Sequence, residues 1–470
     1  MSTRRAPLLL AAALTLGCSG GGDPPPAGSP APRPWQRLAT PTSALPATRG
    51  LRPARGIVHA HSPYSHDACD GEGLTPDGAP DPACAADLRR GMCDAAADFV
   101  FLTDHAEHMA AAPFEDLLFL GEGDAPVLSP AGDVIGNRLA CADGRRVLVT
   151  AGTENALMSL GLERHLPGDP AAREALYRGD DAATAQALRD AGALVWIPHT
   201  ESRAPEYLRE QPFDGIEIYN LHAAIDPDIR AESLGLDGFA AVAGILPFTK
   251  LSPEDPEPDL AFLGFFEDLP RYAEIWDALL PERRVPGVAG TDVHQNTFPG
   301  TLRDEERGDG YRRLMRWFSN VALVEDGAEL TPAALKAALR DGRSYVAFEI
   351  LGVPAGFDLH AEDVGAGGAV VEVGGAAPAG ARVVARAPAM LDPDPAVPAP
   401  EITMRLLRVT AAGTEVVAEG ADVAVEAAAP GVYRAEVRIT PHHLRPYLGP
   451  TPDGYIKSYP WVISNPIYVE

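Results

Sequence analysis

Between residues 56 and 350 the sequence alternates short, continuous apolar runs with segments of helical periodicity. Runs that are apolar throughout are typical of strands in a parallel sheet that is covered on both faces. Repeated strand-then-helix units require right-handed crossovers, so this order predicts an α/β protein with a barrel or an open sheet. The expected strands lie at 57–58, 99–103, 146–150, 194–198, 215–219 and 285–289.

Helical segments are expected between these runs, at 85–97, 181–191, 260–280 and 332–340. The last of them has a clear start, because Thr331 can cap the first turn and Pro332 suits the first helical position. After residue 352 the helical signals vanish. Short alternating stretches at 370–373, 382–387, 402–409, 414–418, 432–439 and 461–469 then predict a small antiparallel β domain of the sandwich type.

Histidines and carboxylates stand directly after the expected strands, although the whole chain has only 12 His. In α/β barrels the carboxyl ends of the strands carry the chemistry. We therefore expect these side chains to meet at one end of the barrel, where such a cluster can hold divalent metals over a substrate. The series comprises His59, His61, His66, His105, Glu154, His199, Asp292 and His294.

The pair His59-Ala60-His61 shows how such residues can share a metal. Alternate residues of a strand face the same way, so both rings can reach one ion. A lone H-x-H pair could equally be two core or surface residues. Asp292-Val293-His294 repeats the arrangement after a later strand, which favours ligation. Glu154 could bridge two cations, and mixed histidine and carboxylate ligation suits zinc, manganese or iron.

The order of these motifs resembles that of the polymerase and histidinol phosphatase (PHP) family over residues 56–350. The resemblance implies a distorted β/α barrel of about seven strands. It also implies two or three divalent metals and hydrolysis of phosphoesters. The ligands that it implies are His59, His61, His66, His105, Glu154, His199, Asp292 and His294.

Two further stretches, at 215–220 and 464–468, resemble a branch of this family that has a carbaryl-hydrolysing member. That branch also carries a C-terminal β region. The chain departs from the family pattern at His66, where many members have Asp, and at Asn220, where several have His. A third metal would therefore be weakly held or absent. His222 is a candidate replacement ligand, and Asn220 a candidate contact to metal or substrate.

Two other polar residues near the motifs have less specific roles. His108 follows His105 by three positions and could line the substrate pocket, or it could be a solvated loop residue. Asp104 is expected to orient a histidine or to pack, rather than to bind metal itself.

The N-terminus predicts an export signal at 1–18. Arg4 and Arg5 precede an apolar run at 7–16 that is too short to span a bilayer. The run ends at Cys18 and resembles a bacterial lipoprotein signal, in which that cysteine bears the lipid. Thr15 departs from the pattern, and an ordinary secretory signal is the alternative. Lipidation would place the protein at the bacterial cell envelope, on the periplasmic or outer-membrane face.

The segments that follow predict the domain organisation. Residues 19–53 are rich in Pro, Gly, Ala and Ser and predict a disordered tether. The metallohydrolase barrel is expected at 54–350 and the β domain at 351–470.

Four cysteines remain after Cys18 is set aside, an even number in an oxidising compartment. Sequence proximity favours the pairs Cys69–Cys84 and Cys93–Cys141 among the three possible pairings. A thiolate zinc site is the alternative, but the chain has no paired C-x-x-C.

The net charge of -27 argues against nucleic acid as a partner, because phosphate backbones bind basic surfaces. It leaves room for a small anionic or ester substrate, since bound cations reverse the local field. The motifs thus favour hydrolysis of a phosphoester by metal-bound hydroxide. A carbamate, ester or amide hydrolase with the same centre is the first alternative. A lipid-anchored protein that binds metal without turnover is the second.

Overall fold

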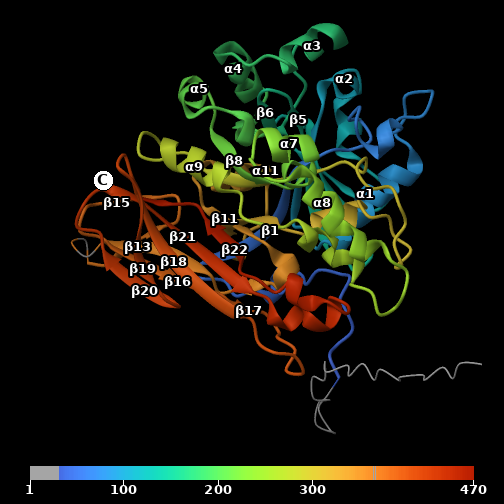
Figure 1. Cartoon of the computed structure of the whole chain (residues 1–470). Coiled ribbons are helices and arrows are strands. Elements are labelled where there is room, and N and C mark those ends of the chain that lie inside the picture. Colours follow the sequence, from blue (N-terminus) through green and yellow to red (C-terminus); the bar gives the residue numbers. More distant parts are fainter. Residues whose placement is uncertain (1–30, 364, 366) are drawn as a thin grey trace, which may run out of the picture.

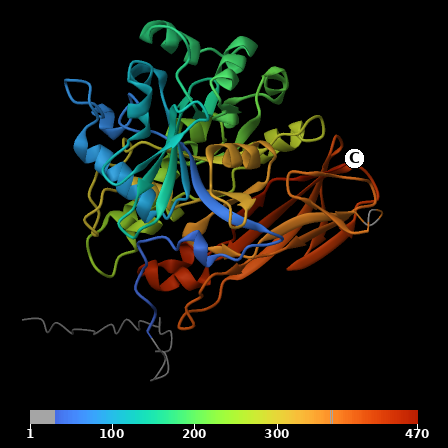
Figure 2. The same ribbon diagram turned by 180° about the vertical axis from the view of Figure 1, so that it is seen from behind.

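The computed structural model describes residues 31–363, 365 and 367–470. The predicted signal peptide and Cys18 lie outside these residues. The described part of the predicted tether lies along the body of the protein (Figures 1 and 2). There the Trp35 indole donates a hydrogen bond to Asp259, and the Arg33 guanidinium pairs with Asp392. Residues 31–50 therefore pack as part of the fold.

The core of the fold is a closed barrel of seven strands (Figure 1). Neighbours around the ring are parallel except at β6, which is antiparallel to both β5 and β7. The predicted distorted β/α barrel is thus confirmed. Its strands are β1 (Leu51–Ala60), β2 (Phe99–Asp104), β5 (Arg146–Glu154), β6 (Met158–Leu162), β7 (Leu194–Ile197), β8 (Gly215–Asn220) and β9 (Gly287–Val293).

The sequence analysis missed β6, and the reason is its connection. Only residues 155–157 separate it from β5, which is too short for the helical crossover that a parallel neighbour needs. The two strands therefore form a hairpin. Gly152 permits their close approach, because a Cβ there would lie 2.0 Å from the Ser159 carbonyl oxygen. A second hairpin extends β5 outward, formed by β3 (Ala125–Leu128) and β4 (Val134–Ala140).

Helices cover the outside of the barrel (Figures 1 and 2). The predicted helix at 332–340 is confirmed, and the Thr331 hydroxyl caps it by accepting a hydrogen bond from the Ala334 amide. The single helix expected at 260–280 is wrong. It divides into a short 3-10 turn, η6 (Pro258–Gly264), and α9 (Pro270–Leu279), because Pro270 favours the start of a helix and disrupts its interior.

The other helices lie between or after the barrel strands in the chain, and the confirmed helix at 332–340 is α11. They are α1 (Pro82–Asp94), α2 (Ala106–Met109), α3 (Pro170–Tyr177), α4 (Ala182–Asp190), α5 (Pro205–Glu210), α6 (Leu221–Ile225), α7 (Pro227–Glu232), α8 (Gly238–Ile245), α10 (Tyr311–Met315) and α11 (Pro332–Arg340).

The C-terminal region is a β structure that continues the barrel sheet. β10 pairs with the first half of β1, and β11, β22, β21, β18 and β19 follow in order. The bounds of this sheet are β10 (Ser319–Glu325), β11 (Ser344–Ala347), β18 (Glu401–Thr410), β19 (Gly413–Glu419), β21 (Gly431–Thr440) and β22 (Tyr459–Ser464), with β15 (Ala376–Ala377) and β23 (Ile467–Val469) at one edge.

A second sheet of four strands packs on this one, as the expected sandwich requires. Leu359 and Val383 of the second sheet share one buried core with Leu406 and Val437 of the first. The predicted β region is therefore confirmed as an architecture, while the boundary at 350 stays a prediction. The strands are β13 (Asp358–Asp363), β14 (Ala369–Glu372), β16 (Arg382–Arg386) and β20 (Asp422–Glu426), and β12 (Pro354–Ala355) pairs with β17 (Ala389–Met390) nearby.

The closing Ser464-Asn465-Pro466 stretch links the β region to the barrel. The Asn465 side chain accepts a hydrogen bond from the Gly287 amide at 2.7 Å and donates one to the Gly287 carbonyl at 2.9 Å. Gly287 is the first residue of β9. The C-terminal region thus holds the start of the strand whose far end carries Asp292.

Both predicted disulfides are present, Cys69–Cys84 and Cys93–Cys141, with Cα atoms 6.2 and 5.6 Å apart. Such bonds fit an oxidising, exported environment. Within the ranges that the structure describes, none of the helices has the length and apolar character to cross a bilayer.

Candidate metal centre

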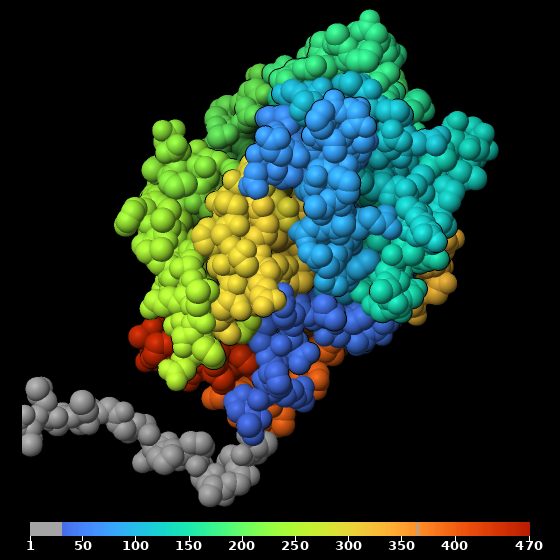
Figure 3. Space-filling view, turned by 90° about the vertical axis from the view of Figure 1, so that its right-hand side faces the viewer, coloured from blue at the N-terminus to red at the C-terminus, as the bar shows by residue number. Residues whose placement is uncertain are grey.

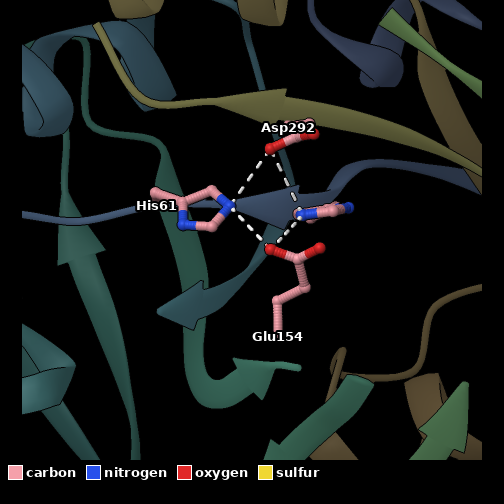
Figure 4. Close-up of side chains that lie close together, drawn as sticks. His61, Glu154 and Asp292 are labelled. Atoms are coloured by element: carbon pink, nitrogen blue, oxygen red, sulfur yellow. Dashed lines mark ion pairs between the residues drawn. The ribbon is translucent and has the colours of Figure 1, made fainter. Parts of the chain in front are cut away.

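Four side chains converge at the carboxyl ends of the barrel strands (Figure 4). His59 comes from β1 and His61 directly follows that strand, while Glu154 comes from β5 and Asp292 from β9. The Nε2 atoms of both histidines face Glu154 Oε2, at 3.3 and 3.5 Å, and Asp292 Oδ1, at 3.3 and 3.1 Å. All four residues are buried. The four side chains therefore lie together at the strand ends, as the sequence predicts.

This group has the donor set and spacing of a divalent metal site. The Nε2 atoms of His59 and His61 are buried and have no hydrogen-bond partner. Two ligands that each lie about 2.1 Å from one ion are roughly 3.0–3.4 Å apart. The four nitrogen–oxygen distances, 3.1–3.5 Å, match that spacing. Two imidazoles and two carboxylates suit zinc, manganese or iron, so the residues fit the expected metal.

The backbone that presents these ligands departs from regular strand geometry. His59, His199 and Asp292 have φ values of 68°, 51° and 53°, which non-glycine residues seldom adopt. The pairing of β1 also shifts register between Val58 and Ala60. A bulge at His59, rather than simple strand alternation, therefore brings the two rings together. Such strain concentrates at functional sites, where the surrounding structure holds it.

A second group adjoins the first through the same carboxylate. His105 Nε2 lies 3.4 Å from Glu154 Oε2 and 3.4 Å from Asp67 Oδ2. Asp67 Oδ1 is 3.6 Å from His61 Nδ1. The His105 Nδ1 atom faces the Glu154 carbonyl oxygen at 3.0 Å, a contact that leaves Nε2 free to bind metal. Glu154 is thus shared by the two groups.

Asp67 is the residue that the sequence analysis overlooked, and its neighbour His66 was named instead. The His66 side chain is 47% exposed and its Nδ1 lies 3.4 Å from Glu107 Oε2. The structure therefore brings Asp67 beside His61 and His105, while the His66 ring packs on that of His105 with 4.8 Å between centroids. The two residues are adjacent, so the motif indicated the right loop. Only the path of that loop decides which side chain turns inward.

His199 approaches the cluster from the other side. Its Nε2 lies 3.0 Å from Glu154 Oε1 and 3.2 Å from Asp292 Oδ2, the oxygens that the first group leaves free. Its Nδ1 lies 3.2 Å from Glu201. Glu201 in turn accepts a hydrogen bond from the Tyr272 hydroxyl at 2.6 Å. Such a carboxylate fixes the orientation of the ring and raises the basicity of a ligating histidine.

Glu217 is the buried partner of His59. Its Oε1 lies 2.6 Å from His59 Nδ1, while its Oε2 accepts hydrogen bonds from the His199 amide and from the Asn220 side chain. This carboxylate therefore positions two of the histidines. Gly290 leaves room for it, because a Cβ at that position would lie 2.0 Å from Glu217 Oε1. Nothing in the sequence of a buried strand marks one carboxylate as such a partner, so the role of Glu217 is visible only in the fold.

The remaining candidates lie at the margin of the cluster. The Asn220 side chain caps α6 by accepting a hydrogen bond from the Ala223 amide, and its Nδ2 faces Asp292 at 3.4 Å. Asn220 thus contacts Asp292, and its role toward metal or substrate stays a prediction. The His294 ring lies 5.5 Å from that of His61 and 5.0 Å from that of His222, both measured between centroids.

His108 and Asp104 lie beside the cluster. His108 is exposed and lines an open hollow of about 940 Å³ together with Tyr64 and Glu107. Asp104 accepts hydrogen bonds from the amide and hydroxyl of Ser62, and so it holds the turn that follows His61. That agrees with the expectation that Asp104 supports the site without binding metal.

The charges of the metal-free cluster compensate one another. Burial raises the pKa of Glu154 and Asp292, but His59 and His199 outweigh it, so both pKa values fall well below their usual range. Burial lowers the pKa of His59, but Asp292 and Glu154 outweigh it and raise that pKa. Contact with Asp67 and Glu154 overcomes burial at His105 and raises its pKa to about 9.

Metal binding is therefore expected to release protons at pH 7. With a pKa of about 9 in the metal-free protein, His105 carries a proton at pH 7 that a metal must displace. The apparent affinity should rise by about tenfold per unit between pH 7 and 9 from this group alone. Calorimetry with Mn²⁺ in two buffers of different ionisation enthalpy counts the protons. His105→Asn should lower the count by one, and an unchanged count would contradict the assignment.

The Cys69–Cys84 disulfide is expected to support the loop that carries Asp67. The Cys69 amide donates a hydrogen bond to the His294 carbonyl at 2.8 Å, and the disulfide ties that point to α1. Replacing both cysteines by serine should weaken metal binding by roughly 10–100-fold, as for other supports of metal ligands. The measurement is a Mn²⁺ titration of the two double variants. In the matched control, Cys93→Ser with Cys141→Ser, stability should fall while metal affinity is kept; equal affinities would contradict this role.

Comparisons with known proteins add little to this geometry. The chain matches no protein-family model, and no curated protein matches it. One similar solved structure is a two-domain protein from Bacteroides vulgatus that contains a predicted PHP-like metal-dependent phosphoesterase. It is 12% identical with a TM-score of 0.31, over 89% of this chain and 97% of that one. Another is PsfC from Pseudomonas syringae, 14% identical with a TM-score of 0.31, over 61% of this chain and 88% of that one.

Proposed function

We propose that this protein is an exported metal-dependent hydrolase that cleaves a phosphoester. The observation that carries the proposal is the shared use of Glu154 and Asp292. Each carboxylate faces His59 and His61 with one oxygen and His199 with the other. Two metals held in this way lower the pKa of a bound water and take up charge on phosphoryl oxygens.

The chain's own residues supply position and rigidity. His59 and Glu217 are buried and His199 is partly buried, and Glu217 contacts the ring of His59 and the amide of His199. Because these contacts exist in the metal-free protein, the ligands need little reorganisation on binding. A site that is already ordered keeps the reacting groups aligned, which is the main contribution of a protein to phosphoryl transfer.

A carbonyl substrate such as an aryl carbamate is the alternative for the same centre. Arg203, Lys250 and Arg271 are cationic side chains that could contact an anionic substrate. Arg271 donates instead to the carbonyl groups of Glu201 and Arg203, the Arg203 guanidinium lies 5.6 Å from the centroid of the Tyr207 ring, and Lys250 is exposed. These contacts commit none of the three to an anion, so the test offers both kinds of ester.

The test uses the full chain, because residues 31–50 pack on the body. The protein is stripped of metal, reloaded with Mn²⁺, Zn²⁺ or Fe²⁺, and assayed with a phosphomonoester, a phosphodiester and an aryl carbamate. We expect metal-dependent cleavage of a phosphoester that Asp292→Asn abolishes. Asp133→Asn, at an exposed turn, is the matched control and should retain activity. Cleavage of the carbamate alone would replace the proposal by its alternative. Metal binding without any turnover would overturn both.

A further inference from the structure

An exposed apolar stripe lies on α8 and the turn that follows it. Phe239, Val242 and Leu246 are 73%, 47% and 58% exposed, and Leu251 is 73% exposed. The spacing of the first three puts them on one face of a helix. These four residues, called the apolar ledge below, are four of the ten large exposed hydrophobic residues in the described part of the chain. Their concentration within 13 residues sets them apart from scattered surface side chains.

The packing of α8 forces this face outward. Ala241, on the opposite side, is fully buried. Gly244 lies against η6 so closely that a Cβ there would be 2.1 Å from the Gly264 carbonyl oxygen. The small side of the helix is therefore docked against the protein, and the large apolar side chains point to solvent. The ledge therefore belongs to a helix that packs firmly on the protein, not to a helix end that has unwound.

The N-terminal segment of the described chain emerges at the same end of the molecule (Figure 3). The Arg33 carbonyl accepts a hydrogen bond from the Tyr447 hydroxyl at 2.6 Å, and the Tyr447 carbonyl accepts one from the Glu257 amide at 2.7 Å. Close by, the rings of Phe248 and Tyr455 lie 5.3 Å apart. These contacts connect the N-terminal segment to the stretch that carries the ledge.

Chain length and charge point to the surface that would cover the ledge. The residues between Cys18 and Ala31 can span at most about 45 Å, so a lipid at Cys18 would keep this end of the protein near a bilayer. Asp237, Glu254 and Lys250 flank the ledge and are exposed. With more acidic than basic groups there, attraction to anionic lipid is not the driving force. The surface suits electrically neutral headgroups.

We propose that the apolar ledge inserts into the interfacial layer of a zwitterionic phospholipid bilayer. It acts as a second attachment point beside the lipid predicted at Cys18. Apolar side chains that enter the interfacial layer add to the membrane affinity that an attached lipid gives. The ledge would define the face of the protein that meets the membrane. This membrane contact does not depend on which reaction the metal centre catalyses.

The first test places a fluorophore on the ledge of the chain from residue 19 to 470. Phe239→Trp is introduced there, so that neither a lipid nor the apolar run at 7–16 is present. The protein is mixed with phosphatidylcholine vesicles whose acyl chains are brominated. We expect quenching of the introduced indole beyond that of the native tryptophans. Leu128→Trp, on a different face and 56% exposed, is the control and should show no added quenching. Equal quenching of the two variants would overturn the proposal.

The second test measures vesicle partitioning of the same chain from residue 19 to 470. Phe239→Asp with Leu246→Asp should lower partitioning by at least about tenfold, whereas Leu128→Asp should leave it unchanged. Anionic lipid in the vesicles should weaken binding. Sedimentation without lipid tests the other occupant of such a face, a second copy of this chain. Self-association that the ledge variant abolishes would overturn the membrane proposal and assign the ledge to a dimer. Unchanged partitioning of a folded ledge variant would overturn it as well.

Discussion

Replacing Asp292 by asparagine is expected to reduce metal-dependent turnover by at least about 1,000-fold, because a divalent metal supplies several kcal/mol of transition-state stabilisation. Asp292 faces His59 and His61 with one oxygen and His199 with the other. Asparagine keeps the shape of the side chain but removes the charge that a cation requires. The measurement is kcat with each metal, alongside metal content after dialysis.

The same variant separates a loss of the site from a loss of the fold. The Asp292 side chain contacts buried histidines, and the pKa of its carboxyl is held below the usual range by His59 and His199 against the effect of burial. Because this carboxylate stabilises the metal-free fold at neutral pH through those histidines, the metal-free variant should unfold several degrees below the metal-free parent. Added Mn²⁺ should stabilise the parent and not the variant. Activity retained by a folded variant would contradict the metal assignment.

The second large effect is expected at Glu217, which touches no metal in this assignment. Glu217→Gln removes the negative charge that faces His59 Nδ1 at 2.6 Å, while the hydrogen bonds to the His199 amide and to Asn220 can persist. Loss of such an orienting carboxylate lowers metal affinity or activity by about 10–100-fold. A metal titration followed by calorimetry measures the loss. The variant's affinity should also depend less steeply on pH, because His59 loses one of the carboxylates that raise its pKa.

Gly290→Ala tests the same contact without changing a charge. A Cβ at Gly290 would overlap Glu217 Oε1, whereas one at Gly300 would meet no atom closer than 4.0 Å. Gly290→Ala should thus reproduce the weaker metal binding of Glu217→Gln, and Gly300→Ala should leave it intact. If both alanine variants bind metal like the parent, Glu217 does not position His59.

The sequence was sufficient for the parts that depend on local pattern. Apolar runs followed by helical segments predicted six barrel strands within a few residues, because burial on both faces requires such runs. Thr331 and Pro332 predicted the start of α11, since capping depends on neighbouring residues only. The two disulfides also followed from proximity, as each joins parts of the chain that are near in sequence and in space.

Three features were not predicted, for two different reasons. The antiparallel β6 and the division of the expected helix at 260–280 follow from local signals, a connection too short for a helical crossover and Pro270 at a helix start. The position of Asp67 beside His61 and His105 depends on tertiary contacts, because the loop after His61 is held by Asp104 and by the disulfide at Cys69. Only this third feature is a property of the assembled barrel.

The sequence by itself determined the α/β class and the set of strand ends that carry His59, His61, Glu154, His199 and Asp292, because residue type and order specify which strands end in ligands. Tertiary structure alone decided how those ligands are aimed. A bulge at His59 and the positive φ of Asp292 turn the side chains inward, and the buried carboxylate of Glu217 fixes the ring of His59. The physical reason is that orientation depends on groups brought together from distant strands.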